Sequence, residues 1–84
     1  MATKILTDED MRGLLLAVGA DPTTNSAHYA RSFDELDLDS LARVEIASRI
    51  RDRFGVNIEE EMVAEQTPAA MRDLVNQRLT SVSS

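Results

Sequence analysis

The stretch from residue 33 to residue 46 decides the fold of this chain, because an acidic loop runs there into an amphipathic helix. It reads Phe33-Asp34-Glu35-Leu36-Asp37-Leu38-Asp39-Ser40-Leu41-Ala42-Arg43-Val44-Glu45-Ile46. Asp39 belongs to the residue types that cap helix starts, and Ser40 follows it directly. The stretch therefore predicts a helix that opens at Ser40, immediately behind four carboxylates.

This helix is expected to extend from Ser40 to Phe54. Its apolar stripe consists of Val44, Ala47, Ile50 and Phe54, with Ile46 at the flank of the stripe. Leu41 and Glu45 fall together on the opposite side, where burial does not explain a leucine. Gly55 is a typical residue just beyond a helix end.

Upstream of this stretch, the sequence predicts a helix near residues 8–18 and a long connection over residues 19–39. Thr7 caps the helix, and three acidic residues follow in the first turn, where the helix dipole favours them. A connection of this length needs contacts with the core. We expect Phe33, Leu36 and Leu38 to provide them.

Downstream, a short helix near residues 59–64 is expected, with Met62 and Val63 turned inward. Thr67 and Pro68 then form a strong start signal for a last helix over residues 68–79. The pattern predicts an all-α fold, a small antiparallel helical bundle with three main helices and one short helix. The 84 residues are expected to form a single domain, 1–84.

Composition and charge exclude several classes of function. The net charge of −6 disfavours nucleic acid as a partner. The chain has no cysteine, which removes disulfides and thiolate chemistry. We see neither a signal peptide nor a segment of transmembrane length, and expect a soluble, cytoplasmic monomer that does not bind membranes. No metal-ligand cluster, phosphate loop or His–nucleophile pair is visible, so an enzyme is not expected.

The stretch 33–46 resembles the attachment region of acyl carrier proteins, in which Asp-Ser-Leu follows an apolar and acidic loop and Val-Glu follows one turn later. The resemblance extends over nearly the whole chain, and is greatest to freestanding carriers of bacterial aromatic polyketide synthases. It has departures: the family usually has glycine at the position of Asp37, and residues 40–54 carry four arginines against two acids.

The resemblance implies a covalent 4′-phosphopantetheine cofactor on Ser40, added by a separate transferase with Mg²⁺. Asp39, Leu41 and Glu45 would serve in partner recognition. Val44, Met62 and Val63 would contact the arm or the acyl chain. The implied partners are a phosphopantetheinyl transferase, a ketosynthase with its chain-length factor, an acyl transferase and tailoring enzymes of polyketide and antibiotic biosynthesis.

Three alternatives stay open at this point. The chain is a peptidyl or aminoacyl carrier, a fatty-acid carrier, or, from another class, a helical interaction module without a prosthetic group. In the last case Ser40 is only a residue of a helix start. The sequence names neither the acyl group nor the final product.

Overall fold

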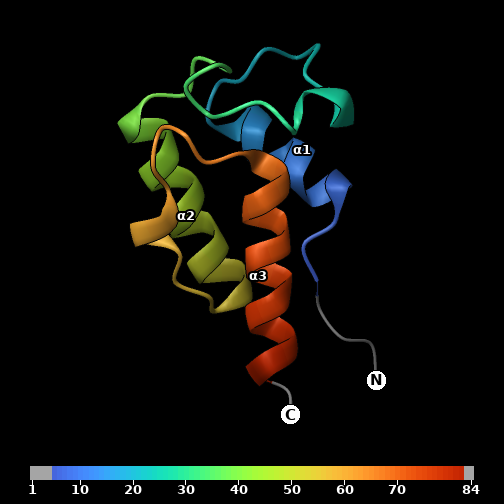
Figure 1. Ribbon diagram of the computed structural model, residues 1–84, viewed down its shortest axis with the longest axis vertical. Coiled ribbons are helices and arrows are strands. Elements are labelled where there is room, and N and C mark those ends of the chain that lie inside the picture. Colours follow the sequence, from blue (N-terminus) through green and yellow to red (C-terminus); the bar gives the residue numbers. More distant parts are fainter. Residues whose placement is uncertain (1–4, 83–84) are drawn as a thin grey trace.

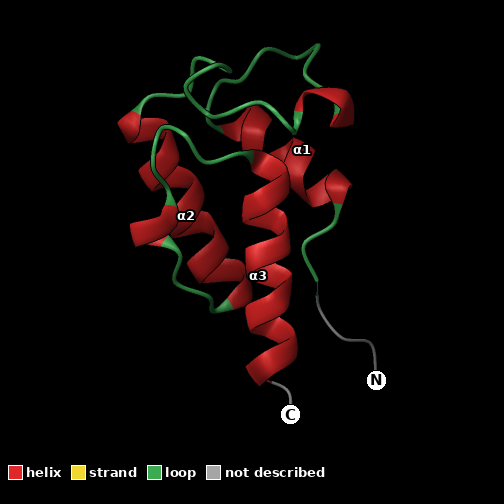
Figure 2. Cartoon of the chain, viewed as in Figure 1, coloured by secondary structure: helices red, strands yellow, loops and turns green. Residues whose placement is uncertain are grey.

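The computed structural model describes residues 5–82. Its helices are α1 (Asp8–Ala17), α2 (Ser40–Phe54) and α3 (Pro68–Val82), with two short 3₁₀ helices, η1 (Ser26–His28) and η2 (Glu59–Glu61) (Figure 1). No strand occurs within the described part of the chain (Figure 2), which confirms the all-α fold. Across residues 5–82, every helix is too short or too polar to cross a bilayer.

The sequence predicts an antiparallel bundle, but only some of the three main helices run antiparallel to one another. α1 runs against α2, since Asp10 in its first turn pairs with Arg53 in the last turn of α2 at 3.3 Å. α2 and α3 instead run in the same direction (Figure 1), because residues 55–67 return along α2 before α3 begins. Contacts at both ends agree: Arg43, early in α2, reaches Met62, and Arg78, late in α3, reaches Asn57.

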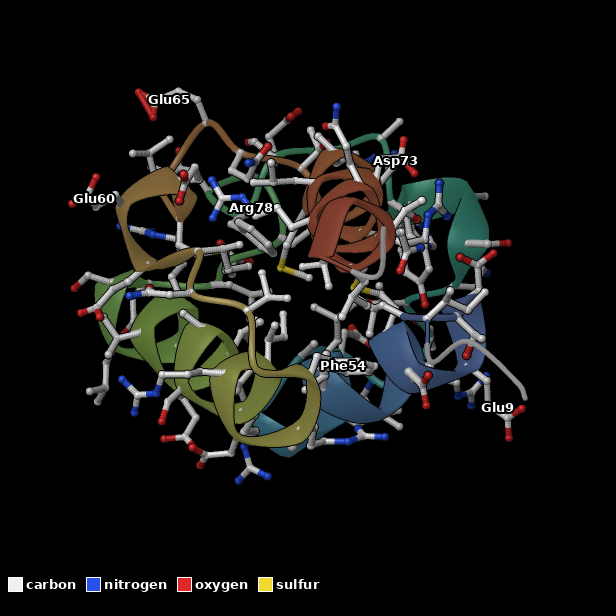
Figure 3. The ribbon with its side chains drawn as sticks, turned by 90° about the horizontal axis from the view of Figure 1, so that it is seen from below. Glu9, Phe54, Glu60, Glu65, Asp73 and Arg78 are labelled. Carbon is white, nitrogen blue, oxygen red and sulfur yellow. The ribbon has the colours of Figure 1, made fainter. Side chains whose placement is uncertain are left out.

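The core lies between the three helices and includes residues from the connections. Its fully buried side chains include Met11, Leu15, Phe33, Ile46, Ile50, Ile58, Met71 and Val75. Seen from below, Phe54 lies at the inner side of α2, whereas Glu9, Glu60, Glu65 and Asp73 lie at the periphery (Figure 3). The helices are therefore held by one apolar cluster to which both long connections contribute.

The helix boundaries follow local capping rules. The Thr7 hydroxyl accepts a hydrogen bond from the Asp10 amide (3.1 Å), and the Asp10 carboxylate accepts one from the Thr7 amide (3.2 Å). This reciprocal cap fixes the predicted start of α1. α1 ends one residue earlier than expected, and α3 continues beyond the expected residue 79 to Val82.

The short helix expected over residues 59–64 is only the 3₁₀ turn η2. Its N-cap residue, Ile58, has no side chain to cap the turn, and the backbone of Met62 leaves helical geometry with ψ at 61°. Met62 is buried as expected. Val63 is 51% exposed, so its predicted inward orientation is wrong.

The long connection before α2 is held to the core as predicted. Phe33 and Leu38 are buried, and Leu36 is half-buried against the same cluster. Two backbone hydrogen bonds hold it further. The Phe33 amide donates to the Gln66 carbonyl (2.8 Å), and the Asp34 amide donates to the Ala64 carbonyl (3.0 Å). The two connections therefore lie side by side next to the start of α2.

Asp37 adopts a backbone conformation that favours glycine. Its φ is 60°, in the left-handed region, and it is the one non-glycine residue with positive φ in the described part of the chain. Aspartate tolerates this region better than most side chains because it is short and polar. The chain thus keeps the loop geometry with Asp37 in place of a glycine, at some cost in strain.

Candidate functional site

Ser40 is exposed as the first residue of α2, at the corner where the acidic loop meets the helix. Asp39 forms the N-cap, and its carboxylate accepts a hydrogen bond from the Ala42 amide at 2.9 Å. Among the interactions of residues 5–82, the Ser40 hydroxyl makes no hydrogen bond. The hydroxyl therefore stands open to an incoming reagent.

The start of α2 suits an anionic group at Ser40. The Asp39 side chain occupies the amide of Ala42, and the Asp39 carbonyl accepts from the amide of Arg43 at 3.0 Å. The amides of Ser40 and Leu41 precede the first intrahelical bond and project from the helix end. These amides and the positive end of the helix dipole favour a phosphodiester at this place.

Three exposed apolar side chains surround the corner. Leu41 is 76% exposed, as expected from its position opposite the stripe, while Val44 is 49% and Val63 51% exposed. Val44 was expected within the stripe, and this prediction is wrong. Ile46, placed at the flank, is fully buried instead. The buried face is centred further round the helix than the sequence pattern suggested, so that Val44 lies at its edge.

The charged residues near Ser40 differ in how they are paired. A shallow depression beside Ser40 is lined by Asp34, Asp37, Leu38 and Asp39. Glu45, one turn further along α2, forms an exposed ion pair with Arg49 at 2.8 Å. Its charge is therefore largely compensated, whereas the loop carboxylates before Ser40 present theirs to solvent.

Sequence reasoning missed the role of Arg43. Its guanidinium donates to the Leu38 carbonyl (3.0 Å) and to the Met62 carbonyl (3.1 Å), joining the two connections beside the start of α2. A signal was present: Arg43 precedes Ala47, Ile50 and Phe54 at steps of four, three and four residues, on the buried face. A charged side chain there needs polar partners.

The geometry is that of a carrier for a covalently attached group: a small helical bundle that presents one free hydroxyl at a helix start. A family model described as phosphopantetheine attachment site matches residues 17–75. The actinorhodin polyketide synthase acyl carrier protein of Streptomyces coelicolor is 34% identical over 99% of this chain and 100% of its own. An anthracycline acyl carrier protein of Streptomyces peucetius is 42% identical over 62% of this chain and 63% of its own.

Solved structures agree with the sequence comparisons. The solution structure of the 3,7-dioxo-octyl actinorhodin acyl carrier protein from Streptomyces coelicolor has a TM-score of 0.79 and 29% identity. The match covers 96% of this chain and 99% of that one. The chain therefore belongs to the phosphopantetheine-bearing acyl carrier proteins, and within them to the polyketide synthase type. Its cofactor is phosphopantetheine, and its family is one of carrier domains that work with synthase enzymes.

Proposed function

We propose that Ser40 bears the phosphopantetheine arm, and that the chain carries polyketide intermediates on it as thioesters for the enzymes of a polyketide synthase. The observation that carries this proposal is the exposed Ser40 hydroxyl at the start of α2, with Asp39 as its cap. The similarity to the actinorhodin carrier over the full length of both chains supports the polyketide pathway.

Attachment forms one bond and breaks one. The Ser40 oxygen bonds to the phosphorus of the phosphopantetheine moiety of coenzyme A, adenosine bisphosphate leaves, and the serine proton passes to a base. We assign the base and the Mg²⁺ to a phosphopantetheinyl transferase, since the carrier catalyses nothing itself. The chain supplies position: the helix start holds the hydroxyl outward and stabilises the phosphodiester that results.

The neighbours of Ser40 are assigned to recognition. Leu41 is the apolar anchor, because an exposed leucine beside the reacting hydroxyl fills a partner's pocket without weakening the core. Asp39 steers basic partner surfaces, and Glu45, which is paired with Arg49, contributes to recognition at short range. Val44, Met62 and Val63 line the side of α2 along which the arm and the acyl chain lie. The proposed partners are the transferase, a ketosynthase with its chain-length factor, an acyl transferase and tailoring enzymes.

Intact mass after incubation with a broad-specificity transferase, coenzyme A and Mg²⁺ tests the attachment. We expect the mass of one phosphopantetheine to be added, and Ser40→Ala to abolish the addition. Ser48→Ala, on the same helix and half-buried, is the matched control and should be modified like the wild type. An unmodified wild type would favour an interaction module, and modified Ser40→Ala would place the arm on another residue.

Loading of the holo protein separates the pathways. We expect a polyketide acyl transferase to transfer malonyl groups to the arm. We expect adenylation enzymes not to load aminoacyl groups onto it. Efficient aminoacyl loading would make the chain a peptidyl carrier, and elongation by fatty-acid enzymes alone would make it a fatty-acid carrier. We further propose that the chain works as one monomeric, cytoplasmic carrier domain.

A further inference from the structure

Arg43 is a half-buried cation that has no anionic partner within residues 5–82. The other three arginines of α2, which are Arg49, Arg51 and Arg53, each form an ion pair with a carboxylate. Arg43 forms none with the described residues, although it is less exposed than the other three. Removing a charge partly from water raises the cost of leaving it unpaired. The position therefore favours an anion beside the guanidinium.

The guanidinium of Arg43 lies beside the backbone that leads into α2. Its Nη1 donates to the Leu38 carbonyl at 3.0 Å, and its Nε donates to the Met62 carbonyl at 3.1 Å. Carbonyl dipoles orient the guanidinium but do not neutralise its charge. A guanidinium has five N–H donors, so donors on both terminal nitrogens have no acceptor among residues 5–82. Arg43 is therefore held in place while it keeps donors for a further acceptor.

Arg43 and Ser40 lie on the same side of the start of α2. The two residues are three apart in a helix, which is a spacing at which side chains are neighbours. Leu38, to which Arg43 donates, precedes Ser40 by two residues, so the Arg43 side chain extends back past Ser40. This end of α2 lies where the two long connections of the chain meet (Figure 1). An anion on the Ser40 oxygen therefore lies within reach of the remaining donors of Arg43.

We propose that Arg43 binds the phosphodiester that joins the arm to Ser40, and so positions the first bonds of the arm. The inference rests on the proposed attachment at Ser40. Arginine suits phosphate oxygens because its planar fork of donors can bond two oxygens at once and its charge is permanent. In the apo protein the guanidinium has no anion among the described residues, and attachment supplies one. The holo protein is therefore expected to be more stable than the apo protein, mainly through Arg43.

Urea unfolding of the apo and holo proteins tests this pairing. In the wild type we expect the unfolding equilibrium constant to be roughly tenfold smaller for the holo than for the apo protein, because a charge-assisted hydrogen bond adds to the effect of the helix start. Arg43→Gln keeps an N–H donor for a backbone carbonyl but has no charge, so this ratio should fall to about twofold. Arg51→Gln makes the same change at an exposed arginine near the other end of α2. It is the matched control and should keep the wild-type ratio.

NMR spectroscopy gives a readout that does not depend on stability. We expect the phosphorus resonance of the folded holo protein to differ between the wild type and Arg43→Gln, and to coincide when both are unfolded in urea. In the wild type, the Nη protons of Arg43 should shift and exchange more slowly with water after attachment, because phosphate oxygens accept them. Arg43→Lys keeps the charge and should retain part of the holo gain in stability, which decides the question if Arg43→Gln does not fold.

Failure of this pairing can be told apart from failure of the attachment. Intact mass shows first whether the arm is present, and a wild type without phosphopantetheine would refute the attachment and the pairing together. If the arm is present but Arg43→Gln keeps the wild-type ratio, or the Nη protons of Arg43 do not change, the pairing is wrong and the attachment stands. An equal loss in Arg51→Gln would also overturn the pairing, since it would show a general effect of net charge.

Discussion

We expect Leu41→Ala to slow the attachment of phosphopantetheine to Ser40 while barely changing the free energy of unfolding. Leu41 is 76% exposed, so roughly a quarter of its surface is removed from water on folding. Full burial of a leucine side chain contributes about 2 kcal/mol, and truncation at this position should therefore cost about 0.5 kcal/mol. As an interface anchor, the same side chain should carry more than 1 kcal/mol of partner binding.

Leu38→Ala is the matched control, since it makes the same truncation three residues earlier in a side chain that is only 3% exposed. It should cost about 3 kcal/mol of stability, as buried leucines do. Urea unfolding of the apo proteins gives the stabilities, and transferase kcat/KM at limiting carrier gives recognition, with about a tenfold loss expected for Leu41→Ala. If Leu41→Ala destabilises as much as Leu38→Ala, the assigned helix face is wrong, and an unchanged kcat/KM would remove Leu41 from the interface.

Three further predictions concern the scaffold. Asp37→Gly should raise the free energy of unfolding, measured in urea, by about 0.5 kcal/mol, because glycine adopts positive φ without strain. A variant less stable than the wild type would show that Asp37 is not strained. The hydrogen bond from the Thr7 amide lowers the pKa of Asp10 below 3.8, so its contribution to stability is present above that pH and is lost as the pH falls through the folded-state pKa. Asp10→Asn should therefore be destabilised near neutral pH but not in strong acid, and a constant difference across pH would refute this. Asn76→Ala should cost about 2 kcal/mol in thermal or urea unfolding, since Asn76 bonds both the amide (2.7 Å) and the carbonyl (3.0 Å) of Leu6, and a change near zero would show that water replaces it.

The features that sequence predicted well are those that neighbouring residues decide. Asp39 caps α2 as expected because an N-cap needs only its own carboxylate and an amide three residues on. Gly55 ends the same helix with φ at 72°, a conformation that glycine alone adopts freely. Phe33 and Leu38 attach the long connection to the core, since apolar side chains within an acidic loop are removed from water only by packing there.

The features that sequence did not predict depend on contacts between distant segments. The direction of α3 relative to α2 follows from the return of residues 55–67 along α2, which Arg78 and Arg43 secure through backbone carbonyls that no sequence pattern marks. Val63 was assigned to the interior from an expected helix, but the turn ends at Glu61 and its side chain points outward. The sequence analysis grouped Arg43 with the other three arginines of residues 40–54, although its spacing places it on the buried face.

The pairing of charges indicates which part of the described surface keeps uncompensated negative charge. The arginines of α2 on the outside are engaged: Arg49 with Glu45 at 2.8 Å, and Arg53 with Asp10 at 3.3 Å. Within the part of the chain that the structure describes, the carboxylates of residues 34–39 form no ion pair. Since paired charges largely cancel beyond a Debye length, uncompensated negative charge remains at the loop before Ser40. We therefore expect that the arginine-rich second helix does not repel basic partners, and that the loop steers them toward the end of the bundle where Ser40 lies.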